Sequence, residues 1–454
     1  MATAAKWEDD IMAKRIRNVL ITNAIALNGG DAAILQATIA ILKRRFGDDV
    51  SITVHDMAAH ASAKYYPALN FRRDVYSETV GWAKGRVRPL IAALAVLTAA
   101  KTQHVPLLGG AVSRMLPGAL MRTLADYAQT DLIVSSGGTY LVPHYTHASK
   151  LLDFLVAQAF RKPLVLFTQS LGPFPATKRR FVLSHALRNA TLILIRDEKS
   201  LRHLQDIGVS PARTRLCADA AFALAAPDLK GRSFSLDEPH PRIAISVRDW
   251  THFAAGQETD GMERYLASMA ALTGNLVEQR GAHVTFISTC QGAPEYWTDD
   301  ARIAGEIVRR LPDALKSRVT IDRNFHRPEE LIAKFAEFDL TVATRFHAAI
   351  LSLCAGTPVL PIAYEFKTSE LFTRFGLGET MVEIEKISPD AVLAAVEKTA
   401  ICWSRNADKV WSAVMSERQS AFGAADQIAR ALGLPAATDP VSALVRGTAL
   451  QAGD

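Results

Sequence analysis

Short apolar segments alternate with helical segments along most of this chain, and this alternation limits the folds that it can adopt. Apolar strand patterns occupy residues 17–24, 131–134, 243–247 and 340–342, and a polar turn follows each of them. Strands that alternate with helices form parallel sheets whose two faces are both covered by helices. Residues 226–241 are rich in Pro, Asp, Lys and Ser, which is typical of a linker. The sequence therefore predicts two doubly wound, Rossmann-like α/β domains.

The same pattern suggests where the domains begin and end. We expect an N-terminal domain at residues 1–235, a C-terminal domain at 240–400, and C-terminal helices with a tail at 401–454. Residues 57–125 look less regular and are expected to form an insert in the first domain. Residues 388–433 have an amphipathic helical pattern, so the second half of the chain should end in helix.

Composition excludes several classes of protein. The 454 residues are 49% hydrophobic and 22% charged, which is ordinary for a globular chain, and the net charge of +6 suits an anionic substrate or membrane surface. The sequence contains no basic run interleaved with aromatic residues, so nothing in it favours nucleic-acid binding. The four cysteines form no C-x-x-C pair, which argues against a zinc site or a disulfide framework. The first 15 residues lack the apolar segment of a secretory signal, so we expect a reduced, cytoplasmic protein.

Two apolar patches, at residues 90–100 and 105–112, leave two interpretations open. As a helix the first patch would extend only about 16 Å, against roughly 30 Å of hydrocarbon in a bilayer, so it cannot span a membrane. Basic residues flank both patches, namely Arg86, Arg88, Lys101, Arg114 and Arg122. Ordinary helical packing is one interpretation, and peripheral contact with the inner face of a membrane is the other.

The segment 339–367 places charged residues directly after two buried strands. Arg345 and His347 follow the first strand at the start of an apolar helix, and Lys367 follows the second. An arginine offers a planar fork of donors to a carboxylate or phosphate, and a histidine exchanges a proton near neutral pH. Free N–H groups at a helix start also favour an anion. The alternative is that Arg345 pairs with a carboxylate while His347 caps or packs.

Two more arginines occupy the equivalent place in the pattern. Arg196 follows the strand at 192–195 and Arg248 follows the strand at 243–247, as Arg345 follows the strand at 340–342. Ligands bind outside the carboxyl ends of strands in open parallel sheets. Three arginines at this edge indicate a small polyanion that carries both a phosphate and a carboxylate.

Polar turns after other strands complete the candidate site. The first strand leads into Asn28, Gly29, Gly30 and Asp31, in a layout that brings backbone close to a ligand without forming G-x-G-x-x-G or a P-loop. In the simpler interpretation, Asp31 only caps the following helix. Later turns are expected to contribute two further pairs of residues, which are Gly137 with Gly138 and Gln169 with Ser170.

Taken in order, these motifs resemble those of the polysaccharide pyruvyl transferases, over residues 20–377. The matching motifs are Asn28–Asp31 with Ala33–Leu35, Ser136–Gly138, Gln169–Pro173, Arg196–Asp197 with Ser200, Asp219–Phe222, Ser246–Arg248, Arg345–His347 and Tyr364–Lys367. The chain departs from the family in having Phe346 where leucine is usual, Gly30 in the first loop, and a long segment at 57–125.

The resemblance implies a fold like that of the GT-B glycosyltransferases and a transfer from phosphoenolpyruvate that forms a pyruvate ketal on a sugar. The acceptor would be a polysaccharide or its precursor, and one form of the hypothesis has this acceptor linked to a lipid. Neither a cofactor nor a metal would be required. His347 and Arg345 would be catalytic, Arg248, Arg196 and Lys367 would bind the donor, and the glycine-turn residues with Gln169 and Ser170 would bind substrate. Two alternatives are a glycosyltransferase that uses a nucleotide sugar and a non-catalytic relative. The latter would be favoured if Arg345 and His347 were buried in ion pairs away from any cleft.

Overall fold

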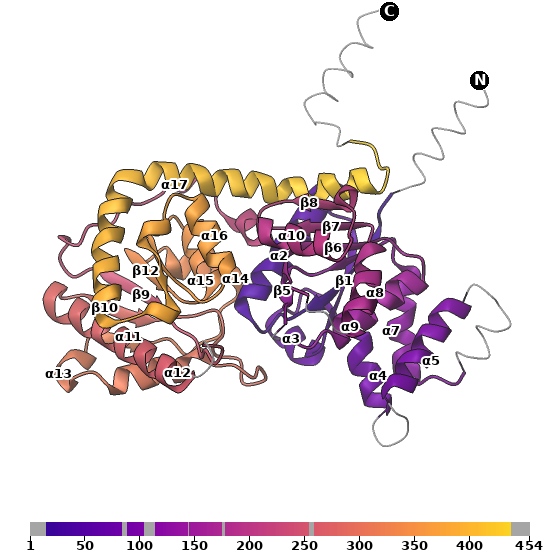
Figure 1. Ribbon diagram of the computed structural model, residues 1–454, viewed down its shortest axis with the longest axis horizontal. Helices are drawn as coiled ribbons and strands as arrows, with labels where there is room; N and C mark the ends of the chain where they lie inside the picture. Colours follow the sequence, from indigo (N-terminus) through magenta and orange to yellow (C-terminus); the bar gives the residue numbers. More distant parts are fainter. Residues whose placement is uncertain are drawn as a thin grey trace, which may run out of the picture.

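The computed structural model describes residues 15–83, 89–103, 114–143, 145–174, 178–253 and 258–436. These residues form two α/β domains that lie side by side, and one long helix runs along both (Figure 1). Each domain has a parallel sheet, so the predicted fold class is confirmed.

The N-terminal sheet has the strand order β3-β2-β1-β4-β6-β7-β8, and β5 pairs with β6 beside this path. Its strands are β1 (Asn18–Ala24), β2 (Ser51–Asp56), β3 (Asn70–Arg73), β4 (Leu132–Ser135), β5 (Gly138–Leu141), β6 (Leu164–Leu171), β7 (Leu192–Ile195) and β8 (Thr214–Leu216). Its helices are α2 (Gly29–Phe46), α3 (Ala59–Tyr65), α4 (Val75–Ala83), α5 (Pro89–Thr102), α7 (Gly118–Gln129), α8 (Ala148–Ala159), α9 (Lys178–Arg188) and α10 (Glu198–Asp206), with short 3-10 turns η1 (Pro211–Arg213) and η2 (Ala220–Leu224).

The C-terminal sheet has the corresponding order β11-β10-β9-β12-β13-β14. Its strands are β9 (Arg242–Ser246), β10 (His283–Phe286), β11 (Val319–Ile321), β12 (Leu340–Ala343), β13 (Val359–Ala363) and β14 (Val382–Glu383). Its helices are α11 (Glu258–Arg280), α12 (Asp300–Arg309), α13 (Asp313–Lys316), α14 (Pro328–Phe335), α15 (Phe346–Cys354) and α16 (Phe366–Arg374), with 3-10 turns η3 (Gly378–Thr380) and η4 (Ile384–Lys386). In both sheets the chain reverses direction across the sheet beside the first strand, between β1 and β4 and between β9 and β12. Such reversals open a crevice at the carboxyl ends of the strands.

The strands are apolar because helices cover both of their faces. In β1, Val19 and Ile21 belong to one hydrophobic cluster, whereas Leu20 between them belongs to another. In β9, Ile243 and Ala244 likewise point into different clusters. Successive side chains of a strand point to opposite faces, so each sheet separates two hydrophobic cores.

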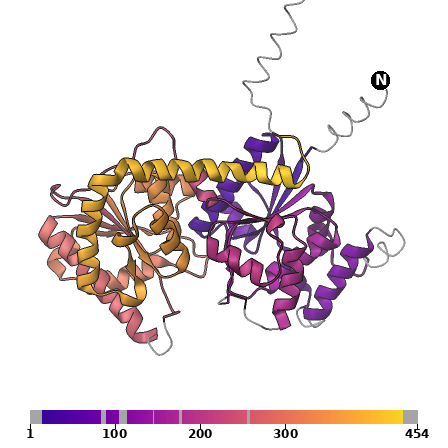
Figure 2. The ribbon, with the colours of Figure 1, turned by 45° about the horizontal axis from the view of Figure 1, so that its top comes forward.

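The last helix, α17 (Pro389–Ala431), joins the domains, which confirms the helix pattern seen at 388–433. Figure 1 and Figure 2 both show it crossing from one domain to the other. Its Val392 packs in the C-terminal core, and its Ile428 packs in the N-terminal core. The expected boundary between residues 400 and 401 therefore falls inside one continuous helix.

Two segments differ from their sequence-based prediction. The segment at 57–125, expected to be less regular, forms α3, β3, α4, α5 and α7 in its described parts. Its elements are short and separated by turns, which hides their periodicity. Strand β6 continues to Leu171 because β5 pairs along its end, with Gly138 opposite Gln169. Gln169 and Ser170 consequently lie inside a strand and not in the turn that we expected.

Several expectations fall outside the described residues, including the patch at 105–112, Arg86, Arg88, the first 14 residues and the tail from 437 onward. Among the described helices, none is both long and apolar enough to cross a membrane.

Candidate active site

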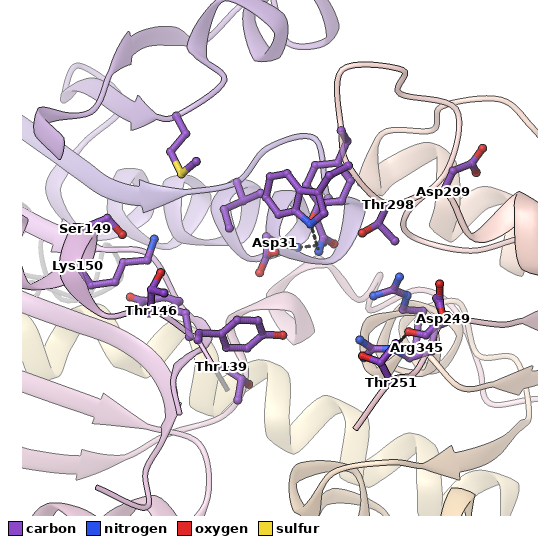
Figure 3. A pocket seen from close by; sticks show the side chains of 18 of the residues that line it. Asp31, Thr139, Thr146, Ser149, Lys150, Asp249, Thr251, Thr298, Asp299 and Arg345 are labelled. Atoms are coloured by element: carbon purple, nitrogen blue, oxygen red, sulfur yellow. Dashed lines mark hydrogen bonds between the residues drawn. The ribbon is translucent and has the colours of Figure 1, made fainter. Parts of the chain in front are cut away.

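The carboxyl edges of the two sheets face each other across a cleft, as the polar residues after successive strands indicated. The cleft contains an inner cavity of about 110 Å³ and an adjoining outer cavity of about 510 Å³. Asn28, Asp31 and Thr139 from the N-terminal domain line both cavities, and so do Arg248 and Arg345 from the C-terminal domain. Figure 3 shows Lys150 and Asp31 on one side of the outer cavity and Thr298, Asp299 and Arg345 on the other.

The inner cavity collects the charged residues that the sequence singled out. Its lining includes all five predicted basic residues, which are Arg196, Arg248, Arg345, His347 and Lys367. They come from four different strand ends, those of β7, β9, β12 and β13. Their surroundings differ, and these differences determine what each one can do.

Arg345 lies at the start of α15 and is held by a carboxylate. Its Nε and Nη2 donate to the two oxygens of Asp300, at 2.9 and 2.6 Å. Burial opposes the charge on Arg345, but Asp300 raises the pKa of the guanidinium well above its usual value. The alternative expectation, that Arg345 pairs with a carboxylate, is therefore correct. The pair nevertheless lies in the cleft. This fork-to-fork geometry fixes the guanidinium plane at the cavity wall.

His347, in the first turn of α15, contacts the other domain. Its Nε2 lies 3.5 Å from Oδ2 of Asp219, a distance that suits an ion pair better than a hydrogen bond. Its ring packs on the first turn of α2, where a Cβ on Gly30 would lie only 2.6 Å from Nδ1. Gly30 thus gives the histidine room to approach the helix.

Arg196 is buried, and its guanidinium nitrogens bind other groups of the protein. Its Nε donates to Ser170 at 2.9 Å, its Nη2 donates to Thr139 at 2.8 Å, and its Nη1 pairs with Asp219. Burial opposes ionisation of Asp219, but Arg196 and then His347 hold the pKa of this carboxyl well below its usual range. The ion pair with Arg196 therefore keeps Asp219 negatively charged, and this charge lies beside His347.

Arg248 has a different environment. Its guanidinium lies 4.1 Å from the ring centre of Tyr364 and 4.8 Å from that of Trp250. Its Nε donates to the backbone carbonyl of Asp249 at 3.4 Å, and it forms no ion pair with a carboxylate among the residues that the structure describes. Aromatic faces position a guanidinium without neutralising it. Of the three arginines, Arg248 is the one whose charge remains available to a ligand.

Lys367 combines an ion pair with a contact across the cleft. Its Nζ lies 2.7 Å from Glu365 and donates to Thr139 of the N-terminal domain at 3.1 Å. Burial disfavours the ammonium, but Glu365 raises the pKa of Lys367 above its ordinary value. Lys367 therefore keeps its charge in the inner cavity.

The residues of the first glycine turn have separate roles. Asn28, and not Asp31, caps α2, because its Oδ1 accepts from the N–H groups of Gly30 and Asp31. The N–H of Gly29 donates to the carbonyl of Thr289 in the other domain at 2.7 Å. Asp31 is left facing both cavities, and burial raises the pKa of its carboxyl.

Of the other four predicted binding residues, one lines the inner cavity and three lie behind it. Gly138 lines the inner cavity, whereas a Cβ on Gly137 would clash with Thr168. Gln169 is buried and donates to the carbonyl oxygen of Ser136 and to the hydroxyl of Tyr140, and Ser170 accepts from Arg196. Neither Gln169 nor Ser170 lines either cavity.

Sequence reasoning missed the acids that hold the arginines and the residues of the outer cavity. Asp219 belongs to a motif that we noticed but assigned no role. Asp300 and Lys150 carried no signal in the sequence pattern. Aromatic rings also line the outer cavity, namely Tyr145 and the pair Tyr296 and Trp297, whose ring centres lie 4.2 Å apart. In the described parts of the chain, no group of three acidic, histidine or cysteine side chains is placed to hold a metal ion.

Solved structures with a similar arrangement include a protein in complex with UDP-glucose and a putative UDP-N-acetylglucosamine 2-epimerase. Alr3699/HepE of Anabaena, in complex with UDP-glucose, has a TM-score of 0.53 at 14% identity, over 92% of this chain and 99% of that one. A putative UDP-N-acetylglucosamine 2-epimerase from Listeria monocytogenes has a TM-score of 0.55 at 13% identity, over 92% of this chain and 96% of that one. At such identities the likeness establishes the GT-B-like fold and nothing about the ligand.

Sequence comparison is more specific. The amylovoran biosynthesis protein AmsJ of Erwinia amylovora is 25% identical over 414 residues, which cover 88% of this chain and 96% of AmsJ. The family model for polysaccharide pyruvyl transferase matches residues 28–365, from the cap of α2 to the cap of α16, and so includes every predicted site residue except Lys367. The chain therefore belongs to the polysaccharide pyruvyl transferase family.

Proposed function

We propose that the protein transfers the pyruvyl group of phosphoenolpyruvate to a sugar of a polysaccharide or its precursor, forming a pyruvate ketal and releasing phosphate. The observation that carries this proposal is the inner cavity. It is small, and it brings together Arg248, Arg345, Lys367 and His347 at the edge of one sheet. A donor with one carboxylate and one phosphate matches this set of cations.

Backbone groups add to the attraction for an anion. The helices α2, α15 and α16 all begin at the inner cavity, where Asn28, Phe346 and Lys367 contribute to its lining. Free N–H groups and the helix dipole make each such end favourable for negative charge. Arg248, which lacks an acidic partner among the described residues, would bind one anionic group directly. Arg345, already oriented by Asp300, would present its remaining nitrogen, Nη1, to the donor.

The chemistry requires balanced proton movements. The methylene carbon of phosphoenolpyruvate takes up a proton, which leaves an oxocarbenium-like centre on the neighbouring carbon. One acceptor hydroxyl adds to this centre, and a second hydroxyl closes the ketal as phosphate departs with the electrons of its C–O bond. The two hydroxyls lose two protons in all, of which one is now in the methyl group and the other goes to the phosphate.

Two side chains are placed to move these protons. His347 lies in the inner cavity and would protonate the methylene carbon, while Asp219 stabilises the charged imidazole. Asp31 lines both cavities, so it lies where an acceptor hydroxyl would meet the donor. Burial raises the pKa of Asp31, which suits a carboxylate that accepts a proton during the reaction.

The outer cavity would bind the acceptor. Its volume of about 510 Å³ lies within the usual range for ligand sites. Tyr296 and Trp297 offer aromatic faces to the apolar face of a sugar ring, and Trp297 is 71% exposed. Lys150, whose pKa burial lowers, faces the same space. A glycan that enters here would present its hydroxyls at Asp31.

The test is phosphate release from phosphoenolpyruvate, measured with a panel of soluble and lipid-linked glycans. We expect release that depends on one acceptor class. The acceptor should gain the mass of phosphoenolpyruvate less that of phosphoric acid, because the ketal replaces two hydroxyl protons. The His347→Asn variant serves as the matched control for contaminating phosphatase. If phosphoenolpyruvate gives no phosphate with any acceptor while UDP-sugars release UDP, the nucleotide-sugar alternative replaces this proposal.

A further inference from the structure

Two helices of the N-terminal domain expose large apolar side chains instead of burying them. On α5, Leu90 is 72% exposed, and Ile91 and Leu94 are each 55% exposed. On α9, Phe181 is 72% exposed and Val182 is 37% exposed. We call these five side chains the α5/α9 face. Single exposed apolar residues are common on protein surfaces, but a gathering of five on two adjacent helices indicates an interaction site.

Both helices pack on α8, although some eighty residues separate them in the sequence. A groove of about 330 Å³ runs between them over α8, and it is lined by Leu94 and Lys101 of α5 and by His185 of α9. Residues three and four apart share one side of a helix. Leu90 and Ile91 therefore continue the stripe of Leu94, and Phe181 and Val182 continue that of His185. The groove and the α5/α9 face form one surface.

The charged side chains of the two helices themselves have one sign. The sequences of α5 and α9 contain no acidic residue. Lys101, Arg180 and Arg188 form no ion pair with any residue that the structure describes, and their only hydrogen bonds described there go to backbone carbonyls. An apolar surface surrounded by uncompensated positive charge is complementary to a bilayer with anionic headgroups.

Part of this surface lies at one end of the molecule. Figure 1 shows α4, α5 and α7 at the end of the N-terminal domain that lies farthest from the C-terminal domain. Contact there would leave the cleft between the domains uncovered.

We propose that the α5/α9 face docks the protein on an anionic lipid bilayer. Leu90, Ile91, Leu94 and Phe181 would enter the boundary between headgroups and acyl chains, and the neighbouring cations would attract anionic lipid. The proposal revises the membrane interpretation of the apolar patches at 90–100 and 105–112, because two of the five side chains, Phe181 and Val182, come from α9. It does not depend on the donor or on the acceptor.

The experiment is vesicle flotation of the full chain, with vesicles of phosphatidylcholine plus phosphatidylglycerol compared with phosphatidylcholine alone. We expect the wild-type protein to float with the anionic vesicles and to be released as salt screens the charges. The variant Leu90→Ser/Leu94→Ser/Phe181→Ser should bind at least roughly tenfold more weakly, because it removes most of the apolar area. The variant Lys101→Gln/Arg188→Gln should lose the preference for anionic lipid.

A matched control removes exposed apolar residues elsewhere. Leu216 and Ile401 are 55% and 54% exposed and lie outside the α5/α9 face, so Leu216→Ser/Ile401→Ser should float like the wild type. Unchanged thermal unfolding of all variants excludes misfolding. The proposal is wrong if the wild type does not float, or if the α5/α9 variant floats equally well. It is also wrong if light scattering shows a wild-type dimer that this variant abolishes without any vesicle binding, since a second copy would then occupy the face.

Discussion

The two sheets share one strand order, but their carboxyl edges handle charge differently. On the C-terminal edge, Arg345 and Lys367 are paired with acids and Arg248 is held by aromatic rings, so their positive charges are permanent. On the N-terminal edge, Arg196 and Asp219 also form a permanent pair, but half-buried Asp31 and buried Lys150 have no ion-pair partner among the described residues. Burial moves the pKa of Asp31 upward and that of Lys150 downward.

The comparison separates two functions, anion binding and proton exchange, whose residues the fold brings together. A permanent charge suits the binding of an anion, whereas a group whose pKa is shifted toward neutrality suits the exchange of a proton. His347 belongs to both edges, because it begins α15 of the C-terminal domain and pairs with Asp219 of the N-terminal domain. The closed contact between the domains thus assembles the proposed acid.

The largest effect should follow from replacing His347. The variant His347→Asn keeps a polar side chain of similar shape but cannot deliver a proton, so kcat should fall by about two to four orders of magnitude. The dissociation constant for phosphoenolpyruvate, measured by titration, should stay close to that of the wild type. Turnover near the wild-type level would show that the proton comes from another group.

Arginine variants test the difference between paired and unpaired charges. Arg248→Lys and Arg345→Lys both lose the planar fork, and each should weaken donor binding by roughly ten- to a hundredfold, the range expected for one charge-assisted hydrogen bond. Arg345→Met should in addition lower the free energy of unfolding by about 3–5 kcal/mol, because the buried carboxylate of Asp300 would keep its hydrogen bond from Ser288 but lose its cation.

Arg248→Met supplies the control for the stability effect. Arg248 has no acidic partner among the described residues, so its loss should reduce donor affinity with little change in stability. Equal destabilisation by the two methionine variants, measured by urea unfolding, would contradict the distinction between the arginines.

Gly30 tests whether contact between the domains sets the position of His347. In Gly30→Ala the new methyl group would meet the imidazole ring at 2.6 Å and displace it. A displacement of about 1 Å can reduce turnover by about a hundredfold. Gly423→Ala is the matched control, since a Cβ there meets no atom within 4 Å and alanine favours the helix α17. Similar turnover in both variants would exclude a positioning role for Gly30.

The positions of the arginines could be predicted from the sequence, but their partners could not. A strand pattern followed by Arg196, Arg248 or Arg345 predicts the edge at which each lies, because parallel strands end together. Asp300 pairs with Arg345 from 45 residues away at the start of another helix, and no local pattern connects them. Competing local signals also misled us. Asn28 and Asp31 are both good capping residues, and only the backbone shows that Asn28 is the cap.

The smallest effect is a change of stability with pH, and it compares two carboxyls on the N-terminal edge, of which Asp31 is half-buried and Asp219 is buried. Burial raises the pKa of Asp31, so the folded state holds a proton that the unfolded chain has already released. Stability should therefore decrease as the pH rises from the ordinary value of 3.8 through the higher folded pKa, by up to about 1.4 kcal/mol per pH unit.

Asp219 should act in the opposite direction. Although burial opposes ionisation there too, Arg196 lowers its pKa, so its contribution is complete above the ordinary value and is lost as the pH falls. Thermal unfolding over a pH series measures both slopes. Burial also raises the pKa values of Asp56 and Asp153, so Asp31→Asn should make the decrease on the rising side shallower without abolishing it. An unchanged slope in this variant would show that Asp31 does not contribute.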